Sequence, residues 1–437
     1  MDSLTIGFIG LGISLFLMAL RVPIAIALGL VSFIGIMIIR GAGSAFTIIG
    51  SVPFDFAASW TLSAIPMYLL MGAFAYHAKI TTALFDAART WFGRLPGGVA
   101  VATNFACAGF ASVSGSSLAT AAAMGRIAIP EMLRLKYNEG LAAASAAAGG
   151  TLGALIPPSI MLVIFGWLAE VSVGQLLMAG VVPGILTALM YSGMIILRCS
   201  LNPSLAPRLE IRPTWSDRIS VLTPIWPVPL LVVSILVGIY TGIVTPTEAG
   251  AFGAFVVFMM ALCMRNMTWK TFRESLREAL VSTSSIFFIA ISAIIFTRFL
   301  ALSGLPNFLS QFVSGIEMAP LAIVLVTSVI YLILGMFLDP LGILLITLPI
   351  LLPVFREANI DMIWMGIILI KYIEIGLLTP PVGLNVFVVK SVVGDRIPIM
   401  RIFGGMTWFL LAEAIIMVLL IAFPEITLTL PNMMAGS

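Results

Sequence analysis

The chain has 437 residues, of which 61% are hydrophobic and only 9% are charged. Its mean hydropathy of +1.16 exceeds what a soluble core requires, so the composition excludes a soluble protein and indicates a multi-pass integral membrane protein. The net charge of +3 gives no support for a nucleic-acid partner.

The first half, residues 1–198, holds apolar runs that are long enough for membrane crossings of about 20 residues. A segment between the third and fourth runs has a turn at its centre, and we expect it to form a re-entrant hairpin. Residues 79–93 combine an apolar and a charged face, which is typical of a helix in the membrane interface. The crossings are expected near 4–20, 22–40, 53–77, 140–168 and 174–198, and the hairpin over 98–133.

The turn of this hairpin reads Ser112-Val-Ser-Gly-Ser-Ser117. Glycine and small hydroxyl side chains let the backbone bend and leave carbonyl and hydroxyl groups free inside the membrane. Such groups are costly in lipid, so they are tolerated where they line a cavity or bind a ligand. Ser116 is expected to cap the helix that follows the turn.

The next crossing, 140–168, contains Gly149-Gly-Thr-Leu-Gly153 and then Pro157-Pro158 without any charge. Glycines and tandem prolines predict that this helix unwinds in the middle of the membrane. Free carbonyls and half-helix C-termini favour Na⁺ there, whereas half-helix N-termini favour an anionic substrate.

A proline-rich linker over 199–221, expected to be cytoplasmic, leads into the second half, residues 222–437. Residues 266–278 predict a second helix in the membrane interface. In each half the crossings before the hairpin, within 1–78 and 222–298, are expected to form a scaffold. The crossings of the second half are expected near 222–240, 246–264, 279–298, 361–393 and 402–423, and its hairpin over 319–356.

A constant offset of 223 residues relates the two halves. It carries Pro23 to Pro246, Pro130 to Pro353 and Pro157-Pro158 to Pro380-Pro381. Five crossings and a hairpin per half require the halves to have opposite orientations, so we predict an all-α inverted repeat with about ten transmembrane helices. The layout puts 17 of the 22 basic residues on one side, Arg21, Arg208 and Arg212 among them, and this side is expected to be cytoplasmic. Both termini are then expected to be periplasmic.

The second hairpin and second broken helix follow from the same offset. It places Asp339-Pro340, a strong helix start, opposite Ser116, and Gly376-Leu-Leu-Thr-Pro-Pro381 opposite the first break. If each hairpin tip faces its own broken helix, two cation sites form with an anion pocket between them. The alternative is that Asp339 acts only as a helix cap, or that all four breaks are packing kinks.

Several charged residues lie within apolar segments. Lys371 and Glu374 are three residues apart on one helix and could pair. Glu248 is expected to cap a helix start, and Glu413 to pair or to meet a partner subunit. Arg126 lies about 15 Å along a helix from Ser116, too far to reach a ligand at the tip, so snorkelling or local pairing is expected.

No motif supports a metal-dependent or ATP-driven enzyme. The chain has one histidine, three cysteines without CxxC spacing and no Walker sequence. We therefore expect no transition metal and no catalytic residues.

These stretches, spread over nearly the whole chain, resemble the large membrane subunit of a TRAP transporter (tripartite ATP-independent periplasmic transporter). The resembling sequences are Phe110-Ala-Ser-Val-Ser-Gly-Ser-Ser117, Gly149-Gly-Thr-Leu-Gly-Ala-Leu-Ile-Pro-Pro-Ser159, Met178-Ala-Gly-Val-Val-Pro-Gly184, Thr245-Pro-Thr-Glu-Ala-Gly250 and Gly376-Leu-Leu-Thr-Pro-Pro-Val-Gly-Leu-Asn385. The resemblance implies a Na⁺-driven elevator importer of the bacterial inner membrane, which carries a small organic anion such as a carboxylate, sugar acid or sulfonate and needs no cofactor besides Na⁺. It also implies two partners, a small four-helix membrane subunit, expected here as a separate chain, and a periplasmic substrate-binding protein.

The resemblance also implies ligand residues. Those for Na⁺ would be Ser114, Gly115, Ser116, Gly149, Gly150, Thr151, Gly153, Gly335, Met336, Asp339, Gly376, Thr379 and Pro380. Those for substrate would be Ser116, Ser117, Pro157, Asp339, Pro381 and Asn385. Two other hypotheses stay open at this point: a sodium/anion carrier that needs no binding protein, and a membrane-embedded enzyme or assembly scaffold.

Overall fold

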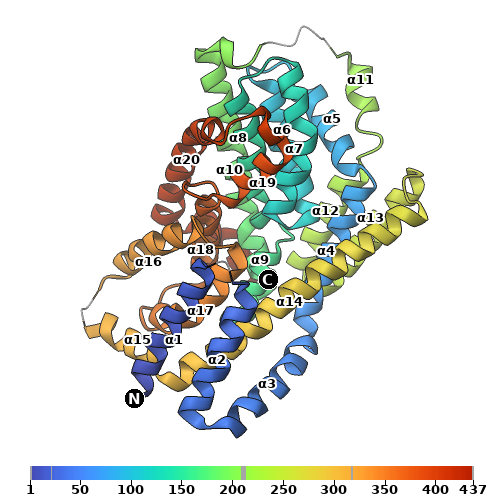
Figure 1. Ribbon diagram of the computed structural model, residues 1–437. Coiled ribbons are helices and arrows are strands. Elements are labelled where there is room, and N and C mark those ends of the chain that lie inside the picture. The colour runs from blue at the N-terminus through green and yellow to red at the C-terminus, as the bar shows by residue number, and fades with distance from the viewer. Residues whose placement is uncertain (1, 21, 208–212, 316–317, 436–437) are drawn as a thin grey trace.

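The structure is a computed structural model that describes residues 2–20, 22–207, 213–315 and 318–435. Within these ranges the chain is helical and contains no strand (Figure 1). Arg21, Arg208 and Arg212, which contribute to the predicted charge asymmetry, lie outside the described residues.

The first half forms ten α-helices, with a short linker helix, α11 (Trp215–Ser220), after them. A 3₁₀ turn over Thr151–Ala154 extends α8 before the chain unwinds. The ten are α1 (Ser3–Ala19), α2 (Ile24–Arg40), α3 (Ala42–Ala57), α4 (Ala64–His77), α5 (Ile80–Phe92), α6 (Gly98–Ser114), α7 (Ser117–Arg134), α8 (Glu139–Gly150), α9 (Ile160–Ala169) and α10 (Val173–Leu201).

The second half forms ten more α-helices. They are α12 (Pro227–Tyr240), α13 (Pro246–Cys263), α14 (Trp269–Ser303), α15 (Leu305–Gly315), α16 (Pro320–Gly335), α17 (Pro340–Glu357), α18 (Met362–Gly376), α19 (Leu384–Val393), α20 (Ile399–Ala422) and α21 (Glu425–Ala435). The pairs α6–α7 and α16–α17 occupy the two predicted hairpin segments, and they reach the middle of the molecule from different ends in Figure 1.

The offset of 223 residues carries over to the helix starts. α7 and α17 begin at positions 117 and 340, and α8 and α18 begin at 139 and 362. The residue types before these starts explain the agreement, since Ser116, Asn138, Asp339 and Asp361 all accept a backbone N–H bond as N-caps. The predicted caps at Ser116 and Asp339 are thus confirmed, as is the capping box that Glu248 forms at the start of α13.

One predicted segment is bent and another is wrong. The span predicted over 53–77 falls on the end of α3 and on α4, a pair that is bent by 61° and passes together as one candidate span. Pro66 lies in the first turn of α4 and has no N–H to continue a helix from the preceding residues. The interface helix predicted over 266–278 is instead the start of the 35-residue α14, because no glycine or proline interrupts residues 269–303.

Length and composition single out fewer spans than the ten predicted. Among the described residues, five helices are long and apolar enough to cross a membrane, or six if the bent pair α3–α4 is one span. Broken and short helices fall below this length even where they are apolar. The predicted number of ten therefore stays a prediction.

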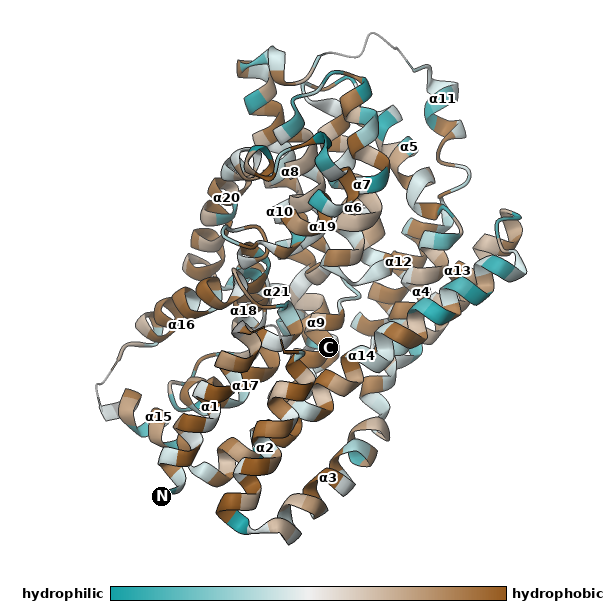
Figure 2. Cartoon of the chain, viewed as in Figure 1, coloured by the Kyte–Doolittle hydropathy of each residue, from teal (hydrophilic) through white to brown (hydrophobic). Residues whose placement is uncertain are grey.

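The burial pattern separates a buried centre from apolar outer helices. Every residue of α8 after Glu139 and every residue of α18 from Trp364 onward is buried. Outer helices instead expose large apolar side chains, which suits contact with lipid, and their ribbons are largely brown (hydrophobic) in Figure 2. Examples are Phe16, Ile38, Phe46, Phe54 and Phe255.

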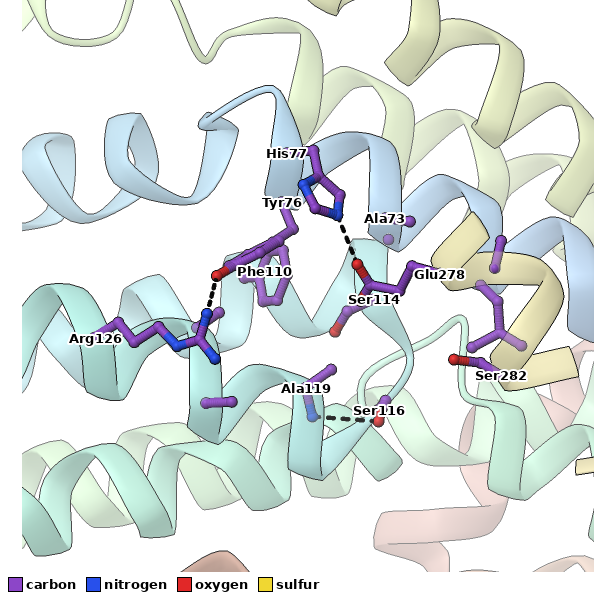
Figure 3. Close-up of a pocket in the computed structure, with 15 residues that line it drawn as sticks. Ala73, Tyr76, His77, Phe110, Ser114, Ser116, Ala119, Arg126, Glu278 and Ser282 are labelled. Carbon is purple, nitrogen blue, oxygen red and sulfur yellow. Dashed lines mark hydrogen bonds and ion pairs between the residues drawn. The ribbon is translucent and has the colours of Figure 1, made fainter. Parts of the chain in front are cut away.

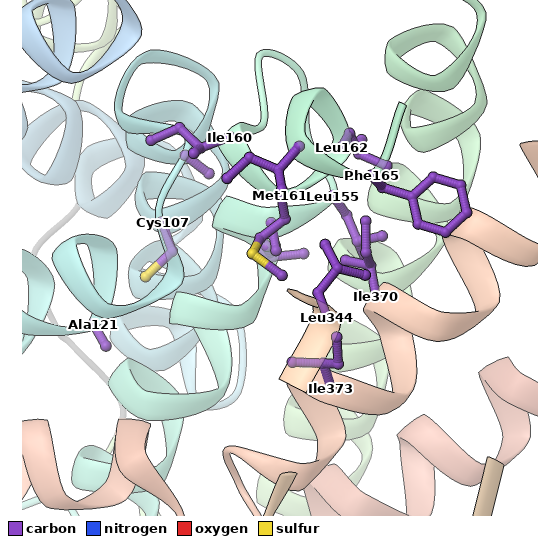
Figure 4. Close-up of a cluster of buried hydrophobic side chains, with 14 of the residues drawn as sticks. Cys107, Ala121, Leu155, Ile160, Met161, Leu162, Phe165, Leu344, Ile370 and Ile373 are labelled. Atoms are coloured by element: carbon purple, nitrogen blue, oxygen red, sulfur yellow. The ribbon is translucent and has the colours of Figure 1, made fainter. Parts of the chain in front are cut away.

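The buried centre joins the two halves of the chain. Figure 4 shows Cys107 of α6, Leu155 and Met161 beside the first helix break, and Leu344 of α17 and Ile373 of α18 in one apolar cluster. These side chains are at most 6% exposed. Both hairpins and both broken helices therefore share one packed core.

A buried ion pair links α18 to α20. Lys371 Nζ lies 2.5 Å from Glu413 Oε2, and the two side chains are 0% and 1% exposed. The Tyr191 hydroxyl of α10 donates to the other oxygen of Glu413. The predicted pairing of Lys371 with Glu374 is wrong, because Glu413 offers a carboxylate that Tyr191 also satisfies, whereas Glu374 accepts a hydrogen bond from Ser117. Glu413 thus pairs within the chain.

We expect Lys371→Met to lower the free energy of unfolding by about 3 kcal/mol or more, since it leaves the Glu413 carboxylate buried without its cation. Unfolding of the purified protein in detergent would measure this. The matched control is Lys270→Met, which removes an exposed pair to Glu274 and is expected to cost about 0.5 kcal/mol or less. Equal losses in both variants would contradict the argument.

Candidate transport site

The turn between α6 and α7 lies directly against the first helix break. Gly115 ends α6 with φ of +61°, a conformation that favours glycine. A Cβ at Gly115 would lie 2.6 Å from the Pro158 carbonyl oxygen, and a Cβ at Gly153 would lie 2.6 Å from the Ser116 carbonyl oxygen. The Ile160 N–H also donates to the Gly115 carbonyl at 3.3 Å. Small residues therefore allow backbone to meet backbone at this point.

The turn between α16 and α17 meets the second break in the same way. A Cβ at Gly335 would lie 2.9 Å from Gly376 Cα, and one at Gly376 would lie 2.5 Å from Gly335 Cα. After Gly376 the chain unwinds until α19 starts, and Gly383 has φ of +62° at that start. Each hairpin turn is thus held on the broken helix of its own half.

Two hydrogen bonds cross between the halves beside these turns. Ser117 Oγ of α7 donates to Glu374 Oε1 of α18 at 2.6 Å. Asn385 Nδ2 of α19 donates to the Ala147 carbonyl of α8 at 3.4 Å. The hairpins and broken helices of both halves therefore hold together as one unit.

A cavity of about 350 Å³, here called the tip cavity, separates this unit from α14. Ser116 and Ser117 reach it from one hairpin turn, and Asp339 reaches it from the other. The remaining wall comes from the residues after the first break and from the apolar and hydroxyl side chains of α14. These are Ile160, Met161, Val281, Ser282, Ser285, Ile286 and Ile289.

A second cavity of about 360 Å³, here called the access cavity, adjoins the tip cavity. Both are lined by Leu69, Ser116 and Ser282. The access cavity extends between α4, α7 and α14, where Tyr76, His77, Arg126 and Glu278 face it (Figure 3). Together the two cavities lead from the hairpin turns to Tyr76 and His77 at the C-terminal end of α4, which α5 follows in the chain.

The structure brings together half of the residues predicted for substrate. Ser116, Ser117 and Asp339 line the tip cavity, whereas Pro157, Pro381 and Asn385 do not. Asn385 is fully buried, and its side-chain amide donates a hydrogen bond to the Ala147 carbonyl. Pro157 is buried and Pro381 is exposed outside this cavity, so the roles of Pro157, Pro381 and Asn385 in substrate binding stay predictions.

The residues predicted for Na⁺ lie on the two hairpin turns and the two breaks described above. Carbonyl and hydroxyl oxygens dominate there, and such hard ligands suit an alkali cation. In the part of the chain that the structure describes, no three His, Cys, Asp or Glu side chains gather to hold a metal ion. The hydroxyls of Ser114 and Thr151 each have a hydrogen-bond partner, Thr120 and the Ala148 carbonyl. Their role as Na⁺ ligands stays a prediction.

The residues of α4 and α14 that line these cavities were not predicted from the sequence. For α14, the signal that could have indicated them is the run Ser282-Thr-Ser-Ser285, which places hydroxyls inside an otherwise apolar segment. Ser282 and Ser285 are three residues apart, so they share a helix face, and that face turns to the tip cavity.

We expect Gly376→Ala to lower the free energy of unfolding by about 1–3 kcal/mol, because the new Cβ meets backbone that cannot move aside. The matched control is Gly193→Ala in α10, where a Cβ would meet nothing within 4 Å. Unfolding curves in detergent compare the two. A Gly376→Ala variant as stable as the control would show that the second hairpin turn and the second break are not in close contact.

Comparison with protein families gives one match that spans almost the whole chain. Residues 11–426 match the family described as "Tripartite ATP-independent periplasmic transporter, DctM component". The chain is 38% identical to the C4-dicarboxylate TRAP transporter large permease protein DctM of Pseudomonas aeruginosa over 387 residues, which is 88% of this chain and 89% of that protein. It is 32% identical to the sialic acid TRAP transporter large permease protein SiaM of Vibrio cholerae, over 86% of this chain and 88% of that one.

A third relative has a longer chain. The isethionate TRAP transporter permease protein DctMQ of Oleidesulfovibrio alaskensis is 33% identical over 86% of this chain and 59% of its own length. Among solved structures, the YdaH transporter of Alcanivorax borkumensis superposes with a TM-score of 0.64 at 14% identity, covering 88% of this chain and 89% of that one. The identity is low, so this likeness concerns the fold alone.

Proposed function

This chain belongs to the DctM component family of tripartite ATP-independent periplasmic transporters, and we propose that it imports a small organic anion with Na⁺. The observation that carries the proposal is the tip cavity, where hairpin turns from both halves meet. Each turn lies against a broken helix, so backbone carbonyls of the breaks stand close to the turns that lead into α7 and α17. Carbonyls suit a cation and N-terminal ends suit an anion, which is the arrangement that coupled transport needs.

The substrate class follows from the relatives. Their names give C4-dicarboxylate, isethionate and sialic acid, each of which carries a carboxylate or sulfonate. We propose a small carboxylate, sugar acid or sulfonate for this chain. The α7 and α17 N-termini, capped by Ser116 and Asp339, both lead into the tip cavity and would place N–H groups near the anion.

The mechanism we propose is an elevator. The hairpins and broken helices move as one unit against a scaffold that includes α4 and α14, and ten crossings in an inverted repeat make up the membrane domain. The shared core and the cross-links at Glu374 and Asn385 support a single moving unit. The access cavity lies toward the predicted cytoplasmic side, which supports an inward-facing state with both termini in the periplasm.

Two partners complete the proposed system in the bacterial inner membrane: a small membrane subunit and a periplasmic binding protein that delivers the anion. The Na⁺ ligands we propose are the two sets of turn and break residues, Ser114–Ser116 with Gly149–Gly153 and Gly335–Asp339 with Gly376–Pro380.

We expect proteoliposomes with both membrane subunits and the binding protein to take up one of succinate, isethionate or N-acetylneuraminate when Na⁺ is higher outside. Replacing that gradient with K⁺ should lower the initial rate about tenfold or more, because the ion binds with the substrate. Radiolabelled uptake measures this. A rate that ignores Na⁺ would refute the coupling, and uptake by this chain alone would indicate a carrier that needs no binding protein.

We expect Asp339→Ala to raise the Na⁺ concentration for half-maximal uptake about tenfold, which corresponds to about 1.4 kcal/mol of ion binding. Its effect on folding should be limited to a lost N-cap, about 1 kcal/mol. Asp361→Ala is the matched control, since it removes an N-cap outside the tip cavity. If the Na⁺ dependence of uptake is unchanged in Asp339→Ala, then Asp339 acts only as a helix cap and not as a Na⁺ ligand.

A further inference from the structure

Arg126 presents a positive charge to the access cavity. It lies on α7, is exposed to the cavity, and donates from Nη1 to the Tyr76 hydroxyl of α4 at 2.7 Å (Figure 3). The local pairing predicted for Arg126 is not what the structure shows, because its hydrogen-bond partner is the Tyr76 hydroxyl on another helix, 50 residues away in the sequence. Among the described residues, no carboxylate lies within 4.0 Å of the guanidinium.

The acidic side chain that lines the same cavity differs, because it already has a partner. His77 Nε2 lies 2.6 Å from Glu278 Oε2. The cavity therefore has a paired carboxylate on the α14 wall and an arginine without a carboxylate on the α7 wall.

The arginine has no counterpart in the second half. The offset of 223 residues carries Arg126 to Pro349, Tyr76 to Phe299 and His77 to Leu300. A charge needed for the architecture of a hairpin would recur in both hairpins. We therefore expect Arg126 to have a role that is specific to the first hairpin and is not required by the architecture of the fold.

Guanidinium chemistry indicates what that is. A charged side chain in a membrane segment is costly, and such residues face cavities where they meet ligands or ions. Arginine has five N–H donors in a planar fork, and the contact to Tyr76 uses one nitrogen. The remaining donors match a carboxylate or sulfonate, with which arginine forms paired hydrogen bonds.

We propose that Arg126, supported by Tyr76, forms a second anion subsite that takes the carboxylate or sulfonate of the substrate in the access cavity. The direction of passage rests on the proposed function, in which the anion leaves the tip cavity toward the cytoplasm. Ser116 and Arg126 are ten residues apart on α7, about 15 Å along the helix. A four-carbon dianion is too short to bridge them, so it occupies the tip cavity and the Arg126 subsite in turn.

The test measures anion binding to the purified full chain in detergent by titration calorimetry, with succinate, isethionate and N-acetylneuraminate as probes and succinamide as the uncharged analogue of succinate. We expect at least one anion to bind and succinamide not to bind. Arg126→Gln should weaken that binding about tenfold or more, the loss of a charge-assisted hydrogen bond, while Arg126→Lys keeps part of it.

Arg134→Gln is the matched control. Arg134 lies on the same helix, is exposed and pairs with Glu131, so its loss should leave anion binding unchanged. Tyr76→Phe tests a purely structural contact between α4 and α7. If Arg126 forms the subsite, Tyr76→Phe should weaken anion binding a few-fold at most, because the guanidinium remains. If the contact between α4 and α7 is purely structural, Tyr76→Phe should weaken anion binding as much as Arg126→Gln.

Three results would overturn the subsite: no anion of the panel binds the wild-type chain, succinamide binds as tightly as succinate, or Arg126→Gln binds like wild type. If Arg126→Gln does not fold, Arg126→Lys and a map of wild type with the bound anion decide, since density away from the guanidinium also contradicts the proposal. Na⁺-driven uptake is measured separately, so an active transporter that fails these tests refutes the subsite alone.

Discussion

An unpaired peptide group inside a bilayer costs several kcal/mol, and this constraint governs the centre of the molecule. Two helices unwind there, at residues 155–159 and 377–383, and their regular helical hydrogen bonding is interrupted. The structure compensates by placing a hairpin turn on each break, with Gly153 against Ser116 and Gly335 against Gly376. Because glycine removes the Cβ, backbone from two segments shares one small volume at each break.

This close packing also decides which parts can move together. The two hairpins and broken helices share an apolar core and are joined across the halves by Ser117 with Glu374 and by Asn385 with Ala147. Their contact with α4 and α14 is interrupted by two cavities. In the elevator mechanism that we propose, relative motion would be easiest along this boundary, because cavities replace side-chain contacts there.

Much of this arrangement could be predicted from prolines and glycines, because they act on the backbone of their own segment. Pro157-Pro158 and Pro380-Pro381 mark the breaks, and Asp339-Pro340 marks a helix start. Contacts between distant helices could not be predicted in this way. Lys371 reaches Glu413 on α20 instead of Glu374 on its own helix, and the lining from α14 depends on how that long helix crosses the hairpins.

The duplicated backbone has one consequence for which side of the membrane the protein opens to. Two related halves facing opposite ways would give equal energies to the state open on either side, so symmetry alone favours neither membrane face. A preference must come from positions where the two copies have diverged, and Arg126 opposite Pro349 is such a position. Any energy difference between the two open states of this protein would then come from a few unmatched side chains, since the duplicated backbone itself treats both directions alike.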